Sequence, residues 1–161
     1  MHAGRGETQL GGDVVCEEFA AQLDRSGLRA SVVTDIATRL WQKLAVNCAI
    51  NPLTALHRCR NGELRELADL ETRIAAVCAE IAAVAGAAGI ALEAADLTTR
   101  VHTVIAGTAA NRSSMLQDVE AGRTTEIDYL NGFVAREGRR LSVSTPANAA
   151  LQAAVHALGG R

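Results

Sequence analysis

The stretch that decides the fold runs from Arg39 to Leu64 and reads RLWQKLAVNCAINPLTALHRCRNGEL. On a helix of about 3.6 residues per turn, its large apolar side chains fall on one stripe. This stripe consists of Ile36, Leu40, Leu44 and Ile50, and it also carries Lys43, Asn47 and Asn51. The small residues Thr38 and Ala45 fall on the opposite side. The pattern therefore predicts that one cation and two amides point toward the surface on which the helix packs.

Polar groups on a packed face are costly unless they find partners. An unpaired buried amide loses about 1–3 kcal/mol, and an unpaired buried ammonium loses more. A polar-walled cleft for a small molecule rich in oxygen atoms would compensate for this cost. An ordinary amphipathic helix, with a snorkelling lysine and asparagines bonded to neighbouring backbone groups, explains the same pattern.

Pro52 is predicted to end this helix. A proline has no backbone N–H, so the carbonyl of Cys48 lacks its usual donor, and the proline ring disfavours a helical conformation at Asn51. Asn51 is thus expected at a helix terminus, beside a free carbonyl group.

The composition predicts an all-α multi-helix bundle. Of the 161 residues, 48% are hydrophobic and only 2% are aromatic, so the core must be built from alanine, leucine, valine and isoleucine. Besides the central helix, periodicity and capping residues predict helices over 13–23, 70–88, 94–110, 113–122, 125–139 and 146–158. A short extended segment is expected at 28–33, before the central helix.

Two polar residues on these helices have structural as well as functional explanations. Ser114 with Gln117 has the spacing of a capping box, and a serine at a helix N-terminus can also help to hold a carboxylate. Glu126 falls in the predicted first turn of a helix, where the helix dipole favours an acid in any case.

Charge and motif content exclude several functions. A net charge of −2, with acids and bases interspersed, predicts neither nucleic-acid nor membrane binding. No apolar run reaches the roughly 18 residues of a membrane span, and the N-terminus does not begin like a secretory signal, so a cytoplasmic location is expected. The four cysteines lack metal-ligand spacing, and we expect them to be reduced and mostly buried, with no metal site.

Two runs of sequence resemble the signatures of the ketopantoate reductase (2-dehydropantoate 2-reductase) family. The first is W-x-K-L-x-x-N-x-x-I-N-P-L-T-A-L, from Trp41 to Leu56, followed by Asn61-Gly62-Glu63-Leu64. The second combines Ser113-Ser114-Met115-Leu116-Gln117-Asp118 with the run from Thr125 to Gly132, TEIDYLNG. The resemblance covers most of the chain from about Leu28 onward, which corresponds to the C-terminal half of that family.

The resemblance implies a helical bundle similar to the C-terminal domain of ketopantoate reductases and of 6-phosphogluconate dehydrogenase-like proteins. It makes Lys43 and Glu126 the catalytic pair, and it assigns Asn47, Asn51 and Ser114 to substrate binding. The substrate would be ketopantoate and the cofactor NADPH, bound mainly by an N-terminal nucleotide-binding domain. Of that domain, residues 1–12 would be a remnant, and 13–161 would form the helical domain. Gly4 and Gly6 form a G-x-G that lacks the context of a dinucleotide-binding loop.

A chain without the nucleotide-binding half is expected to be inactive alone. Two alternatives stay open: a reductase of another branched or bulky 2-keto acid, and a stand-alone helical module that dimerises or binds a metabolite. Helical halves of such dehydrogenases commonly contribute to association, so a homodimer is a further expectation.

Overall fold

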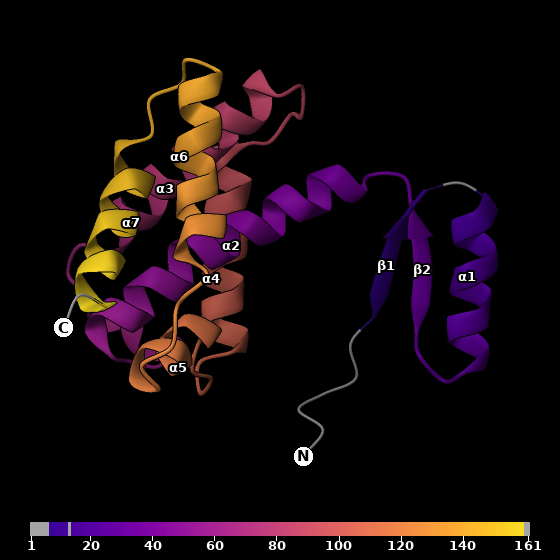
Figure 1. Cartoon of the computed structure of the whole chain (residues 1–161), viewed down its shortest axis with the longest axis horizontal. Coiled ribbons are helices and arrows are strands. Elements are labelled where there is room, and N and C mark those ends of the chain that lie inside the picture. Colours follow the sequence, from indigo (N-terminus) through magenta and orange to yellow (C-terminus); the bar gives the residue numbers. More distant parts are fainter. Residues whose placement is uncertain (1–6, 13, 160–161) are drawn as a thin grey trace. The chain divides into compact units, whose positions relative to one another are not determined.

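The computed structural model describes residues 7–12 and 14–159, and these form two compact units (Figure 1). One unit extends to Leu40 and the other starts at Trp41. The first unit thus contains one helix and one strand that were predicted to belong to the helical domain. The start of that domain after residue 12 stays a prediction. Gly4, Gly6 and Asp13, a predicted helix cap, lie outside the described residues.

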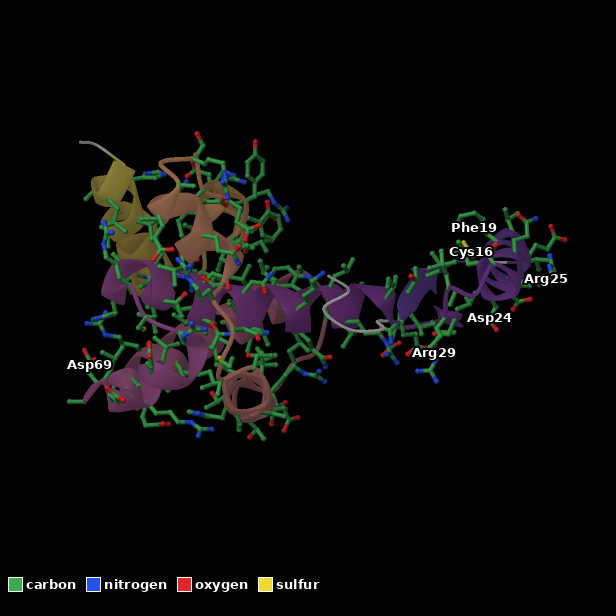
Figure 2. All side chains as sticks on the ribbon, turned by 90° about the horizontal axis from the view of Figure 1, so that it is seen from below. Cys16, Phe19, Asp24, Arg25, Arg29 and Asp69 are labelled. Carbon is green, nitrogen blue, oxygen red and sulfur yellow. The ribbon has the colours of Figure 1, made fainter. Side chains whose placement is uncertain are left out.

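The first unit is a small β-α-β element. Strand β1 (Thr8–Gly11) pairs in parallel with β2 (Ala30–Val33), and helix α1 (Val14–Arg25) connects them. Gly27, at φ +82°, turns the chain after α1. Figure 2 shows α1 nearly end-on, with Phe19 and Cys16 projecting on one side of the helix. Phe19 is 51% exposed, so this helix presents apolar surface to solvent.

Helix α2 (Ile36–His57) continues through Pro52, so the prediction that the proline ends the helix is wrong. The helix ends at Arg58, which has a left-handed φ of +51°. A proline within a helix costs about 3 kcal/mol unless tertiary contacts offset the loss. Here the helix is buried on all sides around the proline, from Cys48 to Ala55, and these contacts hold it in shape.

The face of α2 that packs is also not the predicted one. Leu40 and Lys43 are exposed, whereas Ala45 and Ala49 are buried. Small side chains allow neighbouring helices to approach closely. The prediction of the packed face was based on the large apolar residues instead. The prediction that Lys43 points toward the packed surface is therefore wrong.

The remaining elements form a helical bundle, which confirms the predicted all-α class. In chain order they are η1 (Asn61–Glu66), α3 (Leu70–Ala87), α4 (Ala94–Gly107), α5 (Ser114–Glu120), η2 (Ile127–Tyr129), α6 (Asn131–Arg140) and α7 (Pro146–Gly159). Helix α3 packs against α4 and α7, and α6 lies beside α7 (Figure 1). The largest fully buried side chains include Leu53, Leu64, Ile74, Ile81, Leu97, Ile105, Met115 and Ile127. Within the described part of the chain, no helix is both long and apolar enough to cross a bilayer.

The helix predicted from Thr124 or Thr125 to Arg139 is divided in two. Leu130, with φ −103° and ψ −99°, separates the single 3₁₀ turn of η2 from α6. Glu126 therefore precedes a short turn and does not lie in the first turn of a long helix. Pro146, in contrast, occupies the first position of α7 as predicted.

A buried chain of hydrogen bonds starts at the carbonyl that Pro52 leaves without a donor. Asn131 Nδ2 donates to the Cys48 carbonyl (3.1 Å) and to Asn148 Oδ1 (3.0 Å). Asn148 Nδ2 in turn donates to Glu80 Oε2 (2.7 Å). Both asparagines are completely buried. This chain of hydrogen bonds joins α2, α6, α7 and α3 through the Cys48 carbonyl and the side chains of Asn131, Asn148 and Glu80.

We expect Asn131→Ala to lower the free energy of unfolding by about 2–5 kcal/mol, because two buried acceptors lose their donor. The loss should be smaller by about 1 kcal/mol in a Pro52→Ala background, where residue 52 regains an N–H for the Cys48 carbonyl. Urea unfolding followed by far-ultraviolet circular dichroism would measure both values. Equal losses in the two backgrounds would contradict this link between the proline and the asparagine.

Candidate functional site

Three of the five predicted site residues meet in one hydrogen-bonded cluster. Glu126 Oε1 accepts a bond from Ser114 Oγ (2.8 Å) and another from Asn51 Nδ2 (3.2 Å). Asn51 is 8% exposed, while Glu126 is half-buried and Ser114 is exposed. Two donors on one oxygen suit a carboxylate, and no described residue donates to Oε2. The free oxygen can therefore accept a bond from a ligand or from a nearby cation.

The other two predicted residues lie on the same side of α2 as Asn51. Asn47 is one turn away and half-buried, and Lys43 is a further turn away and exposed. With a rise of about 1.5 Å per residue, Lys43 and Asn51 are about 12 Å apart along the helix. Neither Lys43 nor Asn47 forms a hydrogen bond or ion pair within residues 7–12 and 14–159. The polar strip Lys43–Asn47–Asn51 thus runs from solvent into the protein and ends at Glu126.

Helix α5 is held against α2 by a row of hydroxyl groups that the sequence analysis missed. Ser113 Oγ accepts from the Leu116 N–H (3.0 Å) and lies 2.7 Å from Thr54 Oγ1. Thr54 donates its hydroxyl proton to the Asn51 carbonyl (2.9 Å), so Ser113 must be the donor to Thr54. The helix cap is therefore Ser113, and the predicted capping box at Ser114 is wrong. This leaves the Ser114 hydroxyl available to Glu126.

A serine pair at a helix start was the available signal for this arrangement. Ser113 has the extended backbone of a cap, with φ −62° and ψ 156°, and Ser114 is the first helical residue. Thr54, the partner of Ser113, could not be found from spacing, because the two residues are 59 positions apart in the sequence.

Neither Cys48, the neighbour of Asn47, nor a metal cluster adds reactivity to the described site. Burial raises the pKa of the Cys48 thiol, and the nearby Cys78 adds to this shift, so the thiol stays protonated and unreactive. All four cysteines are free, and Cys48 and Cys78 are buried. Within the described ranges, no three histidine, cysteine, aspartate or glutamate side chains gather as metal ligands would.

The glycines at the end of β1 do not form an open dinucleotide-binding turn. Gly11 is the last residue of β1 and Gly12 follows it, and the space beside each glycine is filled by a side chain of this chain. A Cβ atom on Gly11 would lie 2.1 Å from Ile36 Cγ2, and one on Gly12 would lie 2.3 Å from Cys16 Sγ. A pyrophosphate group could not approach the backbone there as it does in a dinucleotide-binding turn.

Solved structures show where this fold occurs. A PanE/ApbA family ketopantoate reductase from Ralstonia eutropha matches 98% of this chain and 53% of its own, with a TM-score of 0.91 and 32% identity. D-mandelate dehydrogenase in complex with NADH and anilino(oxo)acetate matches 97% of this chain and 67% of its own, with a TM-score of 0.91 and 29% identity. The fold is that of a helical domain found in dehydrogenases and reductases.

Sequence comparison identifies the family. The family model for the C-terminal part of ketopantoate reductase PanE/ApbA matches residues 35–159. The 2-dehydropantoate 2-reductase of Vibrio cholerae is 43% identical over 154 residues, which are 93% of this chain and 52% of the relative. That of Shigella flexneri is 50% identical over 117 residues, 73% of this chain and 38% of the relative. The chain belongs to the ketopantoate reductase C-terminal domain family, and it spans about half the length of these curated relatives or less.

We expect Thr54→Val to lower the free energy of unfolding by about 1–3 kcal/mol, because the substitution leaves Ser113 without its acceptor. Thr54→Ser is the matched control, since it keeps the hydroxyl and removes only a methyl group. Chemical denaturation would compare the two variants. A serine variant less stable than the valine variant would show that packing, and not the row of hydroxyl groups, holds α5 on α2.

Proposed function

We propose that this chain is the substrate-binding and catalytic half of an NADPH-dependent 2-dehydropantoate 2-reductase, which reduces ketopantoate to pantoate in pantothenate biosynthesis. The observation that carries the proposal is the meeting of Asn51, Ser114 and Glu126 at one carboxylate oxygen. These residues come from two sequence signatures that lie far apart in the chain, and each keeps the residue type of the family. The cluster supplies two hydrogen-bond donors and one free carboxylate oxygen at the end of a polar strip.

The chemistry of a 2-keto acid explains why such a strip is useful. Its reduction requires hydrogen-bond donors that hold the carboxylate and a proton for the alkoxide that develops at C2. We assign the donors to Asn47, Asn51 and Ser114, and the proton to Lys43 acting as a general acid. Glu126 would pair with the ammonium group through its free oxygen and keep it charged until the proton is transferred.

The exposure of Lys43 makes this role depend on a second half. In the described chain the lysine faces solvent, where an ammonium group transfers its proton to a substrate less effectively than in a site closed to water. We assign the covering of the strip, and the binding of NADPH as hydride donor, to a nucleotide-binding domain of the kind that makes up the remainder of the longer relatives. The crowded glycines of β1 agree with this division.

Sequence identity favours ketopantoate over other 2-keto acids. The relatives from Vibrio cholerae and Shigella flexneri, at 43% and 50% identity, are both named 2-dehydropantoate 2-reductase, which supports ketopantoate as the substrate. A cytoplasmic location and a homodimer stay predictions. The dimeric ketopantoate reductase from Staphylococcus aureus is only 20% identical to this chain, so its likeness concerns the fold alone.

Calorimetric titration of the chain with ketopantoate and with NADPH tests the division into halves. The same titrations and a turnover assay are then made on the chain fused to the nucleotide-binding half of the Vibrio cholerae relative. We expect very weak NADPH binding and no turnover by the chain alone, and ketopantoate reduction by the fusion. Robust turnover by the chain alone would refute the division, and a fusion that binds NADPH but does not reduce ketopantoate would refute the function.

We expect Lys43→Ala to lower the turnover of the fusion by about 10²- to 10⁴-fold, the usual contribution of a general acid. Lys43→Arg should stay slow as well, because a guanidinium group keeps the charge but does not release its proton. Arg39→Ala, which removes a cation paired with Asp35 from the same helix, is the control. An unchanged rate in Lys43→Ala would remove the lysine from the mechanism.

A further inference from the structure

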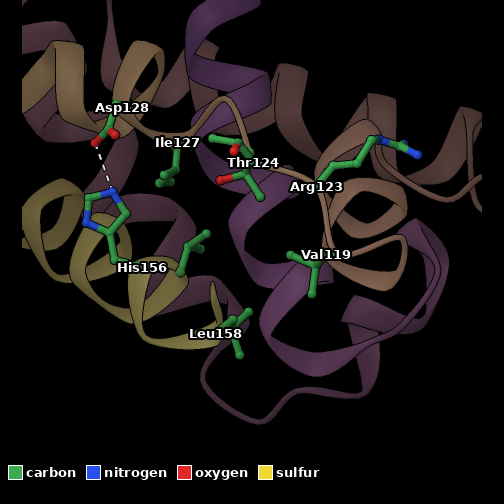
Figure 3. Close-up of a pocket in the computed structure, with 10 residues that line it drawn as sticks. Val119, Arg123, Thr124, Ile127, Asp128, His156 and Leu158 are labelled. Atoms are coloured by element: carbon green, nitrogen blue, oxygen red, sulfur yellow. Dashed lines mark ion pairs between the residues drawn. The ribbon is translucent and has the colours of Figure 1, made fainter. Parts of the chain in front are cut away.

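The segment that carries Glu126 borders a hollow. A pocket of about 480 Å³ lies between this segment and α7 (Figure 3). Its lining includes Thr125 and Ile127, the two neighbours of Glu126, together with Val155 and His156 of α7. On the side of the pocket this segment lacks close-packed neighbours, so apart from the buried Ile127 its position there depends on polar contacts.

Asp128 makes these contacts. One carboxylate oxygen, Oδ1, accepts a bond from Gln152 Nε2 (2.6 Å) and lies 3.0 Å from His156 Nε2. Its backbone carbonyl accepts a bond from Arg136 (2.8 Å). Figure 3 shows the ion pair with His156 at the border of the pocket. Asp128 thus ties η2 to both α6 and α7.

The space for these bonds depends on Gly132. A Cβ atom at this position would lie 2.7 Å from Gln152 Nε2 and 3.4 Å from Asp128 Oδ1. The close neighbour of Gly132 is thus Gln152, the residue that holds Asp128.

We propose that Asp128 is a positioning residue for Glu126. Only Ile127 separates the two acids: Glu126 directly precedes η2, and Asp128 is its middle residue. By fixing η2 on α7, Asp128 keeps Glu126 Oε1 within reach of Ser114 and Asn51. This structural link between Asp128 and the position of Glu126 does not depend on the proposed function, whereas its effect on catalysis rests on that function.

Nuclear magnetic resonance of the chain itself tests the structural link. The probe is the side-chain amide of Asn51, observed with ¹⁵N-labelled asparagine, and Glu126→Ala defines its resonance when the bond to Glu126 is absent. We expect Asp128→Ala to shift this resonance toward the position in Glu126→Ala. Asp69→Ala is the matched control, because Asp69 is similarly exposed (55% against 52%) and also pairs with a basic residue, Arg73, but lies outside α5, η2 and α7. An unshifted Asn51 resonance in folded Asp128→Ala would overturn the proposal.

Two further variants separate positioning from general stability. Asp128→Asn keeps an acceptor for Gln152, so it should restore the Asn51 resonance at least in part. Gly132→Ala should shift the resonance in the same direction as Asp128→Ala, because the new methyl group displaces Gln152. Since Asp128 and His156 are each 52% exposed, truncation at Asp128 leaves no buried void that would unfold the chain. Failure of Asp128→Asn to restore the resonance would contradict the role of the hydrogen bond.

Kinetics of the fusion test the catalytic consequence. We expect Asp128→Ala to lower kcat about 10- to 100-fold, the range expected when a reacting group is misplaced by about 1 Å. In a Glu126→Ala background the same substitution should cause no further loss, because it acts through Glu126. An equal loss in both backgrounds would overturn positioning as the cause. If the unsubstituted fusion is inactive, the proposed function fails, and the Asn51 resonance alone decides the structural link.

Discussion

The rest of the bundle depends on one missing hydrogen-bond donor. Pro52 lies in the buried C-terminal half of α2 and has no N–H to donate to the carbonyl of Cys48, a residue that is itself inaccessible to water. Asn131 supplies the donor from another helix. The direction of the whole hydrogen-bond chain then follows, because a carboxylate only accepts. Glu80 fixes which atom of Asn148 faces it, Asn148 fixes Asn131, and the Asn131 amide group faces Cys48. A flip of either amide would bring two acceptors together.

The candidate site is built on the same turn of α2. Asn51 immediately precedes the proline, its carbonyl accepts the Thr54 hydroxyl, and its side chain reaches Glu126. Thr54 then binds the cap of α5, which places Ser114 beside the same carboxylate. One buried turn therefore positions α6 through its backbone and α5 through its side chains. A substitution at this turn disturbs the fold and the site together, so the two effects must be measured with separate readouts.

The sequence predicted the chemistry of α2 better than its packing. The missing N–H at Pro52 follows from proline alone. The loss of the usual helical donor to the Cys48 carbonyl was therefore predicted correctly. Whether the helix ends at Pro52 depends on contacts made by Asn131, which lies 83 residues from Cys48 in the sequence. No local pattern contains these contacts. The packed face was mistaken because Ala45 and Ala49 bury little area each, and their value lies in how closely a neighbouring helix can approach. Local capping signals, such as Pro146 at the start of α7, succeeded because their cause is local.

The gradient of burial along Lys43, Asn47 and Asn51 suits the proposed function, in which a second domain completes the site. At the buried end, the donors are held by bonds within the bundle, so little conformational entropy is lost there when a ligand binds. At the exposed end, Lys43 stays solvated while it has no partner, and the chain avoids the cost of burying an unpaired charge. If the whole strip were buried, the helical domain by itself would always carry the cost of an unpaired buried charge. Buried, preformed donors together with a solvated lysine thus let the helical domain be stable by itself. In the proposed function, the same domain then presents a charged group to a cleft that a second domain closes.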